Sequence, residues 1–260
     1  GKSWYAAAYK IIQKNKNSYV SKSVDFSSTK TKIQALLVVG DVEYYGTNQG
    51  LWSRAGKGDL KLLKNINVLC LDQLQSGDIL VGSKKGLYYF SSGKLKQYRP
   101  SGDEHAALNN TPIRGIDVIS ANEVWYSTFG MGLYLHDPGT FITIGSADGL
   151  DTGGMVYDLA ADNGKVYIAT GNGLFTYNNG RVTGHYTTAD GLPSNKVLDM
   201  DMDSKGTLWL ATAKGLSQFT GSGFKNYSRK DGLPSSLVTA VHIDHNDDSR
   251  IWTGSTSSGL

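Results

Sequence analysis

The side chains best suited to chemistry lie in the segment 101–110, where Asp103, Glu104 and His105 follow one another. Two carboxylic acids beside an imidazole could supply acid–base catalysis or ligands for a metal ion. Three polar residues in a long loop are more often simply hydrated, so we predict neither a catalytic residue nor a metal site here. Because no packing role explains the segment, Asp103 and His105 are candidate ligand-binding residues.

A second set of candidates is mainly cationic. Arg114, Lys84, Lys85 and Lys214 fall in or beside expected turns, where their charges could receive the carboxylate or sulfate of an acidic sugar. Phe129 interrupts a recurring pattern, and its ring could stack on a sugar face. The simpler interpretations are hydrated surface cations and a core phenylalanine.

Other motifs are poor matches to known chemistry. Residues 201–206 resemble the start of a calcium-binding loop, but Lys205 and Thr212 stand at two of the ligand positions. His242 and His245 are three residues apart, and a strand would place them on opposite faces. We therefore expect no metal and no cofactor.

Composition excludes several classes of protein. The formal charge is +3, from 26 basic and 23 acidic residues, which does not point to nucleic acid. The chain has no apolar run near 18 residues, so we expect no direct membrane insertion of this chain. Cys70 is the one cysteine and lies in an apolar run, where a buried, inert thiol is expected.

A repeated pattern shows which elements must position these residues. Each copy begins with an aromatic or apolar residue, which is followed by any residue, by a small residue and by Ser or Thr, and it ends in a Gly-Leu pair. The copies start at residues 44, 80, 125, 167, 209 and 252. A spacing of about 42 residues is typical of one propeller blade. The recurring aromatic residues, Trp209 among them, are therefore expected to pack one repeat against the next.

A second pattern precedes each copy and completes the repeat. Two apolar residues three apart are often followed by an Asp that opens a short polar turn, as at Val197, Met200 and Asp203. A strand, a tight turn and another strand form a β-hairpin, and the Gly-Leu pair begins a third strand that a further Gly turn joins to a fourth. The fold class predicted is all-β, a propeller of four-stranded antiparallel blades.

The repeats also predict the domain organisation. We expect residues 1–260 to form a single β-propeller domain, with repeats over 33–260 and closing strands over 1–32. Strands over 3–12 and 18–24 would complete the blade begun by residues 238–256, which makes six blades with closure shared between the termini. An alternative aligns residues 4–7 with 209–212 and predicts seven blades in an incomplete chain.

The link sequences Asp190-Gly191-Leu192-Pro193-Ser194 and Asp231-Gly232-Leu233-Pro234-Ser235, with the strands that follow them, resemble the two-component regulator propeller repeat. This resemblance implies the sensor part of bacterial membrane-bound hybrid histidine kinases, usually periplasmic and often responsive to oligosaccharides. The chain departs from that pattern because it contains no kinase, receiver, transmembrane or DNA-binding segment.

We therefore expect a non-catalytic, ligand-binding sensor propeller that recognises a carbohydrate or a protein and is periplasmic or extracellular. Its ligand would meet the face that carries the turns between second and third strands and the links between blades. One alternative is an enzyme, such as a polysaccharide lyase or a metal-assisted lactonase that uses acids of the innermost strands and His105. Another alternative is a structural module that docks neighbouring domains.

Overall fold

The computed structural model describes residues 3–7, 10–15, 18–23, 31–98, 109–120, 123–128, 133–137, 140–152, 155–162, 164–243 and 250–255. In this part of the chain the regular structure is β-sheet with a few single-turn 3-10 helices. The chain divides into two compact units, which are described separately. Unit 1 comprises residues 1–128 and 135–141, and unit 2 comprises residues 129–134 and 142–260.

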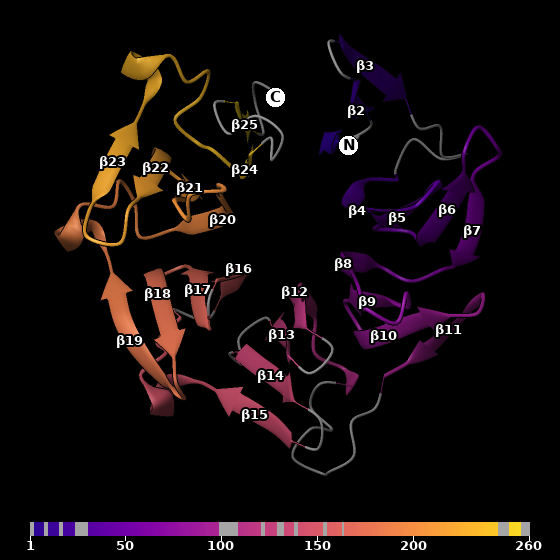
Figure 1. The fold of residues 1–260 in the computed structure, drawn as a ribbon, viewed down its shortest axis with the longest axis horizontal. Coiled ribbons are helices and arrows are strands. Elements are labelled where there is room, and N and C mark those ends of the chain that lie inside the picture. The colour runs from indigo at the N-terminus through magenta and orange to yellow at the C-terminus, as the bar shows by residue number, and fades with distance from the viewer. Residues whose placement is uncertain are drawn as a thin grey trace. The chain divides into compact units, whose positions relative to one another are not determined.

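Five sheets contain four strands each, in the order in which the strands occur in the chain. The first two sheets contain β4 (Ile33–Val39), β5 (Val42–Thr47), β6 (Leu51–Ala55) and β7 (Lys61–Lys64), and then β8 (Val68–Gln73), β9 (Ile79–Ser83), β10 (Gly86–Ser91) and β11 (Lys94–Gln97). The third contains β12 (Ile113–Ser120), β13 (Glu123–Thr128), β14 (Leu133–Asp137) and β15 (Thr140–Ile144). The last two contain β16 (Val156–Asp162), β17 (Lys165–Thr170), β18 (Gly173–Asn178) and β19 (Arg181–Tyr186), and then β20 (Val197–Met202), β21 (Leu208–Thr212), β22 (Gly215–Phe219) and β23 (Phe224–Tyr227). The predicted four-stranded unit is therefore confirmed in five sheets, which Figure 1 labels strand by strand.

Two smaller sheets contain the strands nearest the termini. The first has three strands, β1 (Ser3–Ala7), β2 (Lys10–Asn15) and β3 (Ser18–Ser23), and the last has two, β24 (Ala240–Ile243) and β25 (Ile251–Gly254). The expectation of one strand over residues 3–12 is wrong, because residues 3–7 form β1, which pairs antiparallel with β2 from Ala7 opposite Lys10 to Ser3 opposite Lys14.

The place of β1 bears on the number of blades. Strand β1 packs beside β4, the first strand of the next sheet. In the same unit, β5 is the second strand of its sheet and packs in the same way beside β8, the first strand of the sheet that follows. That place agrees with the alternative alignment, which paired residues 4–7 with the second strand of another repeat. The number of blades and the closure between the terminal sheets stay predictions.

The first strand of each four-stranded sheet carries an irregularity near its start. In β16, Val156 pairs with Thr170 and Asp158 pairs with Ala169, so one residue of β16 is passed over. The same shift occurs in β4, β8, β12 and β20. A β-bulge bends its strand and changes the direction of the next side chains, and it recurs because the repeats share one pattern.

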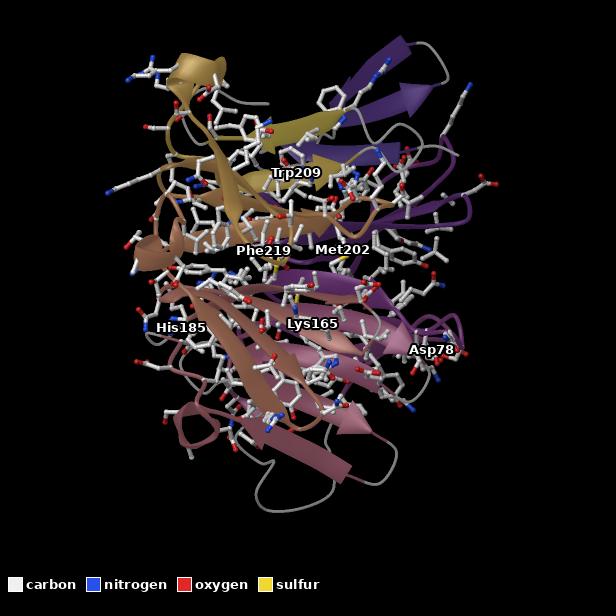
Figure 2. The ribbon with its side chains drawn as sticks, turned by 60° about the vertical axis from the view of Figure 1, so that its left-hand side comes forward. Asp78, Lys165, His185, Met202, Trp209 and Phe219 are labelled. Carbon is white, nitrogen blue, oxygen red and sulfur yellow. The ribbon has the colours of Figure 1, made fainter. Side chains whose placement is uncertain are left out.

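The core of each unit lies between neighbouring sheets. In unit 2, Leu174, Val197, Leu210 and Phe219 form one buried cluster, against which the ring of Tyr186 packs at 4.8 Å from that of Phe219. Trp209 belongs to a second buried cluster that includes residues of β21, β22 and β24. Figure 2 shows Trp209 and Phe219 among the strands of this unit. The predicted packing role of Trp209 is therefore confirmed.

The Asp-Gly-Leu links form the short 3-10 helices η2 (Ser146–Asp148), η3 (Thr188–Asp190) and η4 (Arg229–Asp231). In η3, the Asp190 carboxylate accepts hydrogen bonds from the backbone N–H of Thr187 at 2.8 Å and from its hydroxyl at 3.0 Å. In η4, the Asp231 carboxylate makes the same two bonds with Ser228, both at 2.8 Å. These aspartates organise the links, each through one carboxylate oxygen, Oδ2.

Candidate functional site

The turns between second and third strands are held by a buried hydroxyl. Thr47, Ser83, Thr170 and Thr212 each donate a hydrogen bond to the carbonyl of the glycine three residues later, at 2.7–2.8 Å. The same oxygens accept the N–H two residues later, at 3.0–3.2 Å. Because these bonds fix the backbone, the two residues in the middle of each turn are presented in a set direction.

A backbone hydrogen bond joins each of these turns to the residue just before the first strand of the same sheet. The N–H of Lys84 donates to the carbonyl of Asn67 at 3.0 Å, and the N–H of Ala213 donates to that of Lys196 at 3.1 Å. Equivalent bonds run from Asn48 to Lys32 and from Gly171 to Met155. The prediction that turns and links share one face is confirmed for these four sheets, and we call this edge of each unit the turn rim.

In unit 1 the turn rim carries three cationic residues predicted from the sequence. Lys84 and Lys85 form the turn between β9 and β10, and both are exposed. Gln97 attaches this turn to the following link, since its amide donates to the carbonyls of Lys85 at 3.4 Å and Asn109 at 2.7 Å. Gln97 therefore connects the turn that carries the two lysines to the link that precedes β12.

Arg114 lies on the same rim of unit 1. It is exposed and is the second residue of β12. The preceding residue, Ile113, is fully buried, and its carbonyl accepts a hydrogen bond from the Cys70 thiol of β8 at 3.6 Å. This contact sets the start of β12 beside the sheet that carries Lys84 and Lys85. The Cys70 side chain is half-buried, not buried as expected, and its thiol is hydrogen-bonded to the Ile113 carbonyl.

In unit 2 the turn rim combines cations with an aromatic ring. Lys214 is exposed in the turn between β21 and β22, as predicted, and Lys196 is exposed in the link that precedes β20. The Lys196 ammonium lies over the ring of Tyr157, 5.6 Å from its centroid. Tyr157 is half-buried and is the second residue of β16.

Sequence reasoning missed Tyr157 and Lys196. The signal that could have revealed Tyr157 was its position in the repeat. Tyr157 is the second residue of β16, as the predicted site residue Arg114 is of β12. Three other predicted site residues, Asp103, His105 and Phe129, lie outside the described residues.

His185 is a polar residue of the same rim with a structural task. Its ring stacks on that of Phe175 with centroids 3.9 Å apart, and its Nε2 atom is 2.7 Å from the carbonyl of Asn172 in the turn. Figure 2 labels His185 at this end of the sheet and Lys165, which lies at the end away from the turn. His185 therefore supports the turn between β17 and β18.

Acidic residues of the first strands form a second polar feature, which the sequence did not predict. Their carboxylates accept backbone N–H groups of the next first strand: Asp72 from Val118 at 2.8 Å, Asp158 from Met200 at 2.9 Å, Asp199 from Val241 at 2.7 Å and Asp201 from Ile243 at 2.8 Å. Burial raises the pKa of Asp72, whereas Asp201 is held ionised by its bonds with His242 and Ile243 although burial opposes them.

These acids join strands and do not form a metal centre. In the described ranges, no group of three or more His, Cys, Asp or Glu side chains is arranged to hold a metal ion. Asp203 accepts the N–H groups of Lys205 at 3.0 Å and Thr207 at 2.8 Å, so residues 201–206 end a strand and form a hairpin turn, as the sequence indicated.

Comparison with solved structures shows the class of fold. The extracellular domain of a hybrid two component system from B. thetaiotaomicron matches with a TM-score of 0.75 and 22% identity over 87% of this chain and 32% of that one. A second such domain from B. thetaiotaomicron matches with a TM-score of 0.73 and 19% identity over 97% of this chain and 35% of that one. The chain is a β-propeller of four-stranded antiparallel blades, and it spans about a third of the length of these two structures.

A family model identifies the repeat itself. Residues 191–214 match the model described as two component regulator propeller. The match covers Gly191-Leu192-Pro193 of the link, β20, β21 and the turn that holds Lys214. The resemblance stated from the sequence is thereby confirmed at this repeat. No curated protein sequence matches the chain.

Enzymes also occur among the structures with this fold. A catalytically inactive H270A form of virginiamycin B lyase from Staphylococcus aureus, solved with quinupristin, matches with a TM-score of 0.69 and 13% identity over 90% of this chain and 82% of that one. The fold alone therefore does not decide between binding and catalysis.

Membrane-spanning helices are absent from the described residues.

Proposed function

We propose that this propeller is a non-catalytic recognition module in the extracellular or periplasmic part of a bacterial two-component signalling protein. The observation that carries the proposal is the two component regulator propeller repeat at residues 191–214. The resemblance in fold to extracellular domains of hybrid two component systems supports it. A membrane-bound histidine kinase is the partner that this context implies.

The ligand class proposed is an acidic oligosaccharide, which the turn rim of unit 1 or that of unit 2 would bind. Lys84, Lys85 and Arg114 supply cations in unit 1, and Lys196 and Lys214 supply cations in unit 2. Guanidinium and ammonium groups bind carboxylates and sulfates by charge-assisted hydrogen bonds. The ring of Tyr157 adds an aromatic surface of the kind that packs against the apolar face of a sugar.

The described acids support binding more than catalysis. An enzyme of the lyase or lactonase type would need free acids or a metal, whereas Asp158, Asp199 and Asp201 each accept a backbone N–H of a neighbouring strand. A protein ligand and a docking role are separate alternatives to this proposal.

A comparison of matched sugars tests the proposal. The purified chain is titrated with an oligosaccharide of uronic acids and with the same oligosaccharide after its carboxyl groups have been reduced to alcohols. We expect saturable binding of the acidic form that weakens at higher salt, since exposed charges are screened, and much weaker binding of the reduced form. Equal affinity for the two forms, or turnover of either one, would contradict the proposal.

A further inference from the structure

Three carboxamide side chains lie on the turn rim of unit 1. They belong to Gln34, the second residue of β4, to Asn67, which directly precedes β8, and to Gln49, in the turn between β5 and β6. Gln34 is exposed, and the other two are half-buried. Gln34 takes the place in its strand that Arg114 takes in β12, so this place of the repeat carries a polar group in both strands.

Hydrogen bonds set the orientation of the Gln34 and Asn67 amides. The Gln34 Nε2 atom donates to the carbonyl of Val68 at 2.9 Å and to the Oδ1 atom of Asn67 at 3.0 Å. A backbone carbonyl only accepts, so Gln34 must turn its nitrogen to Val68, and Asn67 must then turn its oxygen to Gln34. Within the described residues, the Gln34 Oε1 atom and the Asn67 Nδ2 group make no further hydrogen bond, so one acceptor and one donor stay available for a ligand.

The third carboxamide is also held in place. The buried hydroxyl of Thr31 donates to the Oε1 atom of Gln49 at 3.1 Å, which leaves the Nε2 group of Gln49 as a donor. The N–H of Asn48 donates to the carbonyl of Lys32 at 3.1 Å and so attaches this turn to the residues just before β4. Because these side chains are already ordered, little conformational entropy is lost when a ligand binds them.

A neighbouring acceptor and donor match the hydroxyl groups of a sugar. Each hydroxyl can both donate and accept a hydrogen bond, so hydroxyls of one sugar unit can satisfy the Gln34 acceptor and the Asn67 donor together. A trans peptide group points its N–H and its C=O in opposite directions, so it meets only one of them from a single surface. Carboxamides carry no charge and do not neutralise an ion. The pattern therefore favours a neutral sugar unit.

The carboxamides adjoin the cationic turn between β9 and β10. The carbonyl of Asn67 accepts the N–H of Lys84 at 3.0 Å, so the backbone that carries the Asn67 amide also holds the first lysine of that turn. An oligosaccharide whose acidic unit contacts Lys84 would therefore continue over Asn67.

We propose that Gln34, Asn67 and Gln49 form a subsite for a neutral sugar unit that is linked to the acidic unit bound by Lys84 and Lys85. This inference rests on the proposed function of the rim in unit 1 and adds the composition of its ligand. The oligosaccharide carries neutral and acidic units side by side.

Titration calorimetry of the intact chain with three oligosaccharides of equal length tests the composition. The probes are a glucuronoxylan oligosaccharide, which joins a glucuronic acid to neutral xylose units, an oligogalacturonate and an uncharged xylan oligosaccharide. We expect the mixed probe to bind more than about 10-fold more tightly than either other probe, since only it satisfies the amides and the lysines together. Oligogalacturonate binding as tightly as the mixed probe would overturn the subsite and leave the proposed function standing. Failure of both acidic probes to bind would overturn both.

A double substitution removes the amides and keeps the lysines. Gln34→Ala with Asn67→Ala should weaken binding of the mixed probe by about 10-fold and that of oligogalacturonate by less than about 3-fold, as expected for lost neutral hydrogen bonds. Gln75→Ala removes an exposed amide at the other end of the β8–β11 sheet and should change neither affinity. An equal loss for the two probes would mean that the amides act only through the lysine turn, and it would overturn the inference.

Side-chain amide resonances in ¹H–¹⁵N spectra test the subsite without any substitution. Addition of the mixed probe should shift the resonances of the Asn67 Nδ2 and Gln49 Nε2 groups, which are the available donors, and should leave those of Gln75 in place. Unshifted Asn67 and Gln49 resonances at saturation would overturn the inference.

Discussion

The Nδ1 atom of His242 lies 2.9 Å from the carboxylate of Asp201, and this pair joins β24 to β20. The same carboxylate oxygen accepts the N–H of Ile243 at 2.8 Å. Although burial acts in the opposite direction, these bonds lower the pKa of Asp201 below its ordinary value. The two-stranded sheet β24–β25 is thus attached to its neighbour by hydrogen bonds to the Asp201 carboxylate as well as by its apolar side chains.

Replacing His242 by Ala should destabilise the chain at pH 6 by about 0.5–1.5 kcal/mol, the usual net contribution of one hydrogen bond. A lowered pKa means that the carboxylate contributes stability above about pH 4 and loses it as the pH falls. The difference between the two chains should therefore shrink at pH 3, as urea unfolding at both pH values would show. A difference of the same size at pH 3 would mean that packing, and not the ionised Asp201, makes His242 stabilising.

The hydroxyl of Thr212 holds the turn that presents Lys214. Thr212→Val keeps the shape of the fully buried side chain but removes its bonds with the carbonyl of Gly215 and the N–H of Lys214. We expect a loss of about 1–3 kcal/mol in the free energy of unfolding, the cost of a buried group left unpaired. Thr212→Ser keeps the hydroxyl and should cost less than half as much, and equal losses would argue against the hydrogen bonds as the cause.

Gly215 and Gly206 both adopt positive φ, at 131° and 77°, but their surroundings differ. A Cβ atom on Gly215 would clash with the carbonyl oxygen of Tyr227, whereas one on Gly206 would meet nothing within 4 Å. Gly206→Ala should therefore cost about 1 kcal/mol for backbone strain alone, and Gly215→Ala should cost at least about 1 kcal/mol more. Thermal or urea unfolding of the two variants gives the comparison, and equal costs would contradict the close approach of Gly215 to β23.

Phe219 is 2% exposed and contacts the rings of Tyr186 and Phe224 in the core of unit 2. Phe219→Ala should cost about 3–5 kcal/mol, because it removes a large buried ring and leaves a cavity. Leu62 is 46% exposed, and Leu62→Ala should change the free energy of unfolding by less than about 0.5 kcal/mol. Urea unfolding measures both values, and a small effect at Phe219 would place the core of unit 2 elsewhere.

Most of the fold was predictable because the chain repeats its own pattern. The spacing of about 42 residues predicted the four-stranded sheets, and the Gly-Leu pairs marked the turns that carry Lys84, Lys85 and Lys214. Residues 3–12 were misinterpreted because that segment has no clear turn residue, and its division into β1 and β2 follows from pairing with neighbouring strands.

The polar features that the sequence did not reveal depend on contacts across repeats. The carboxylate of Asp158 meets the N–H of Met200, 42 residues later in the chain, and Lys196 meets the ring of Tyr157. Such contacts depend on strand register and on the bulge that turns each side chain, which composition and motif spacing do not encode. Aligning the first strands with one another would have brought Asp158 and Asp199 to notice.

The central claim is that the turn rim binds an acidic oligosaccharide, and isothermal titration of rim variants tests it most directly. The variants are Lys84→Glu with Lys85→Glu in unit 1, and Lys196→Glu with Lys214→Glu in unit 2. Lys165→Glu with Lys205→Glu makes the same change in charge at the opposite end of the sheets of unit 2. We predict that at least one rim pair weakens binding of a uronic-acid oligosaccharide by more than 10-fold, while the control pair changes it by less than 3-fold, as expected for lost charge-assisted bonds. Unchanged affinity in both rim pairs, or an equal loss in the control pair, would contradict the claim.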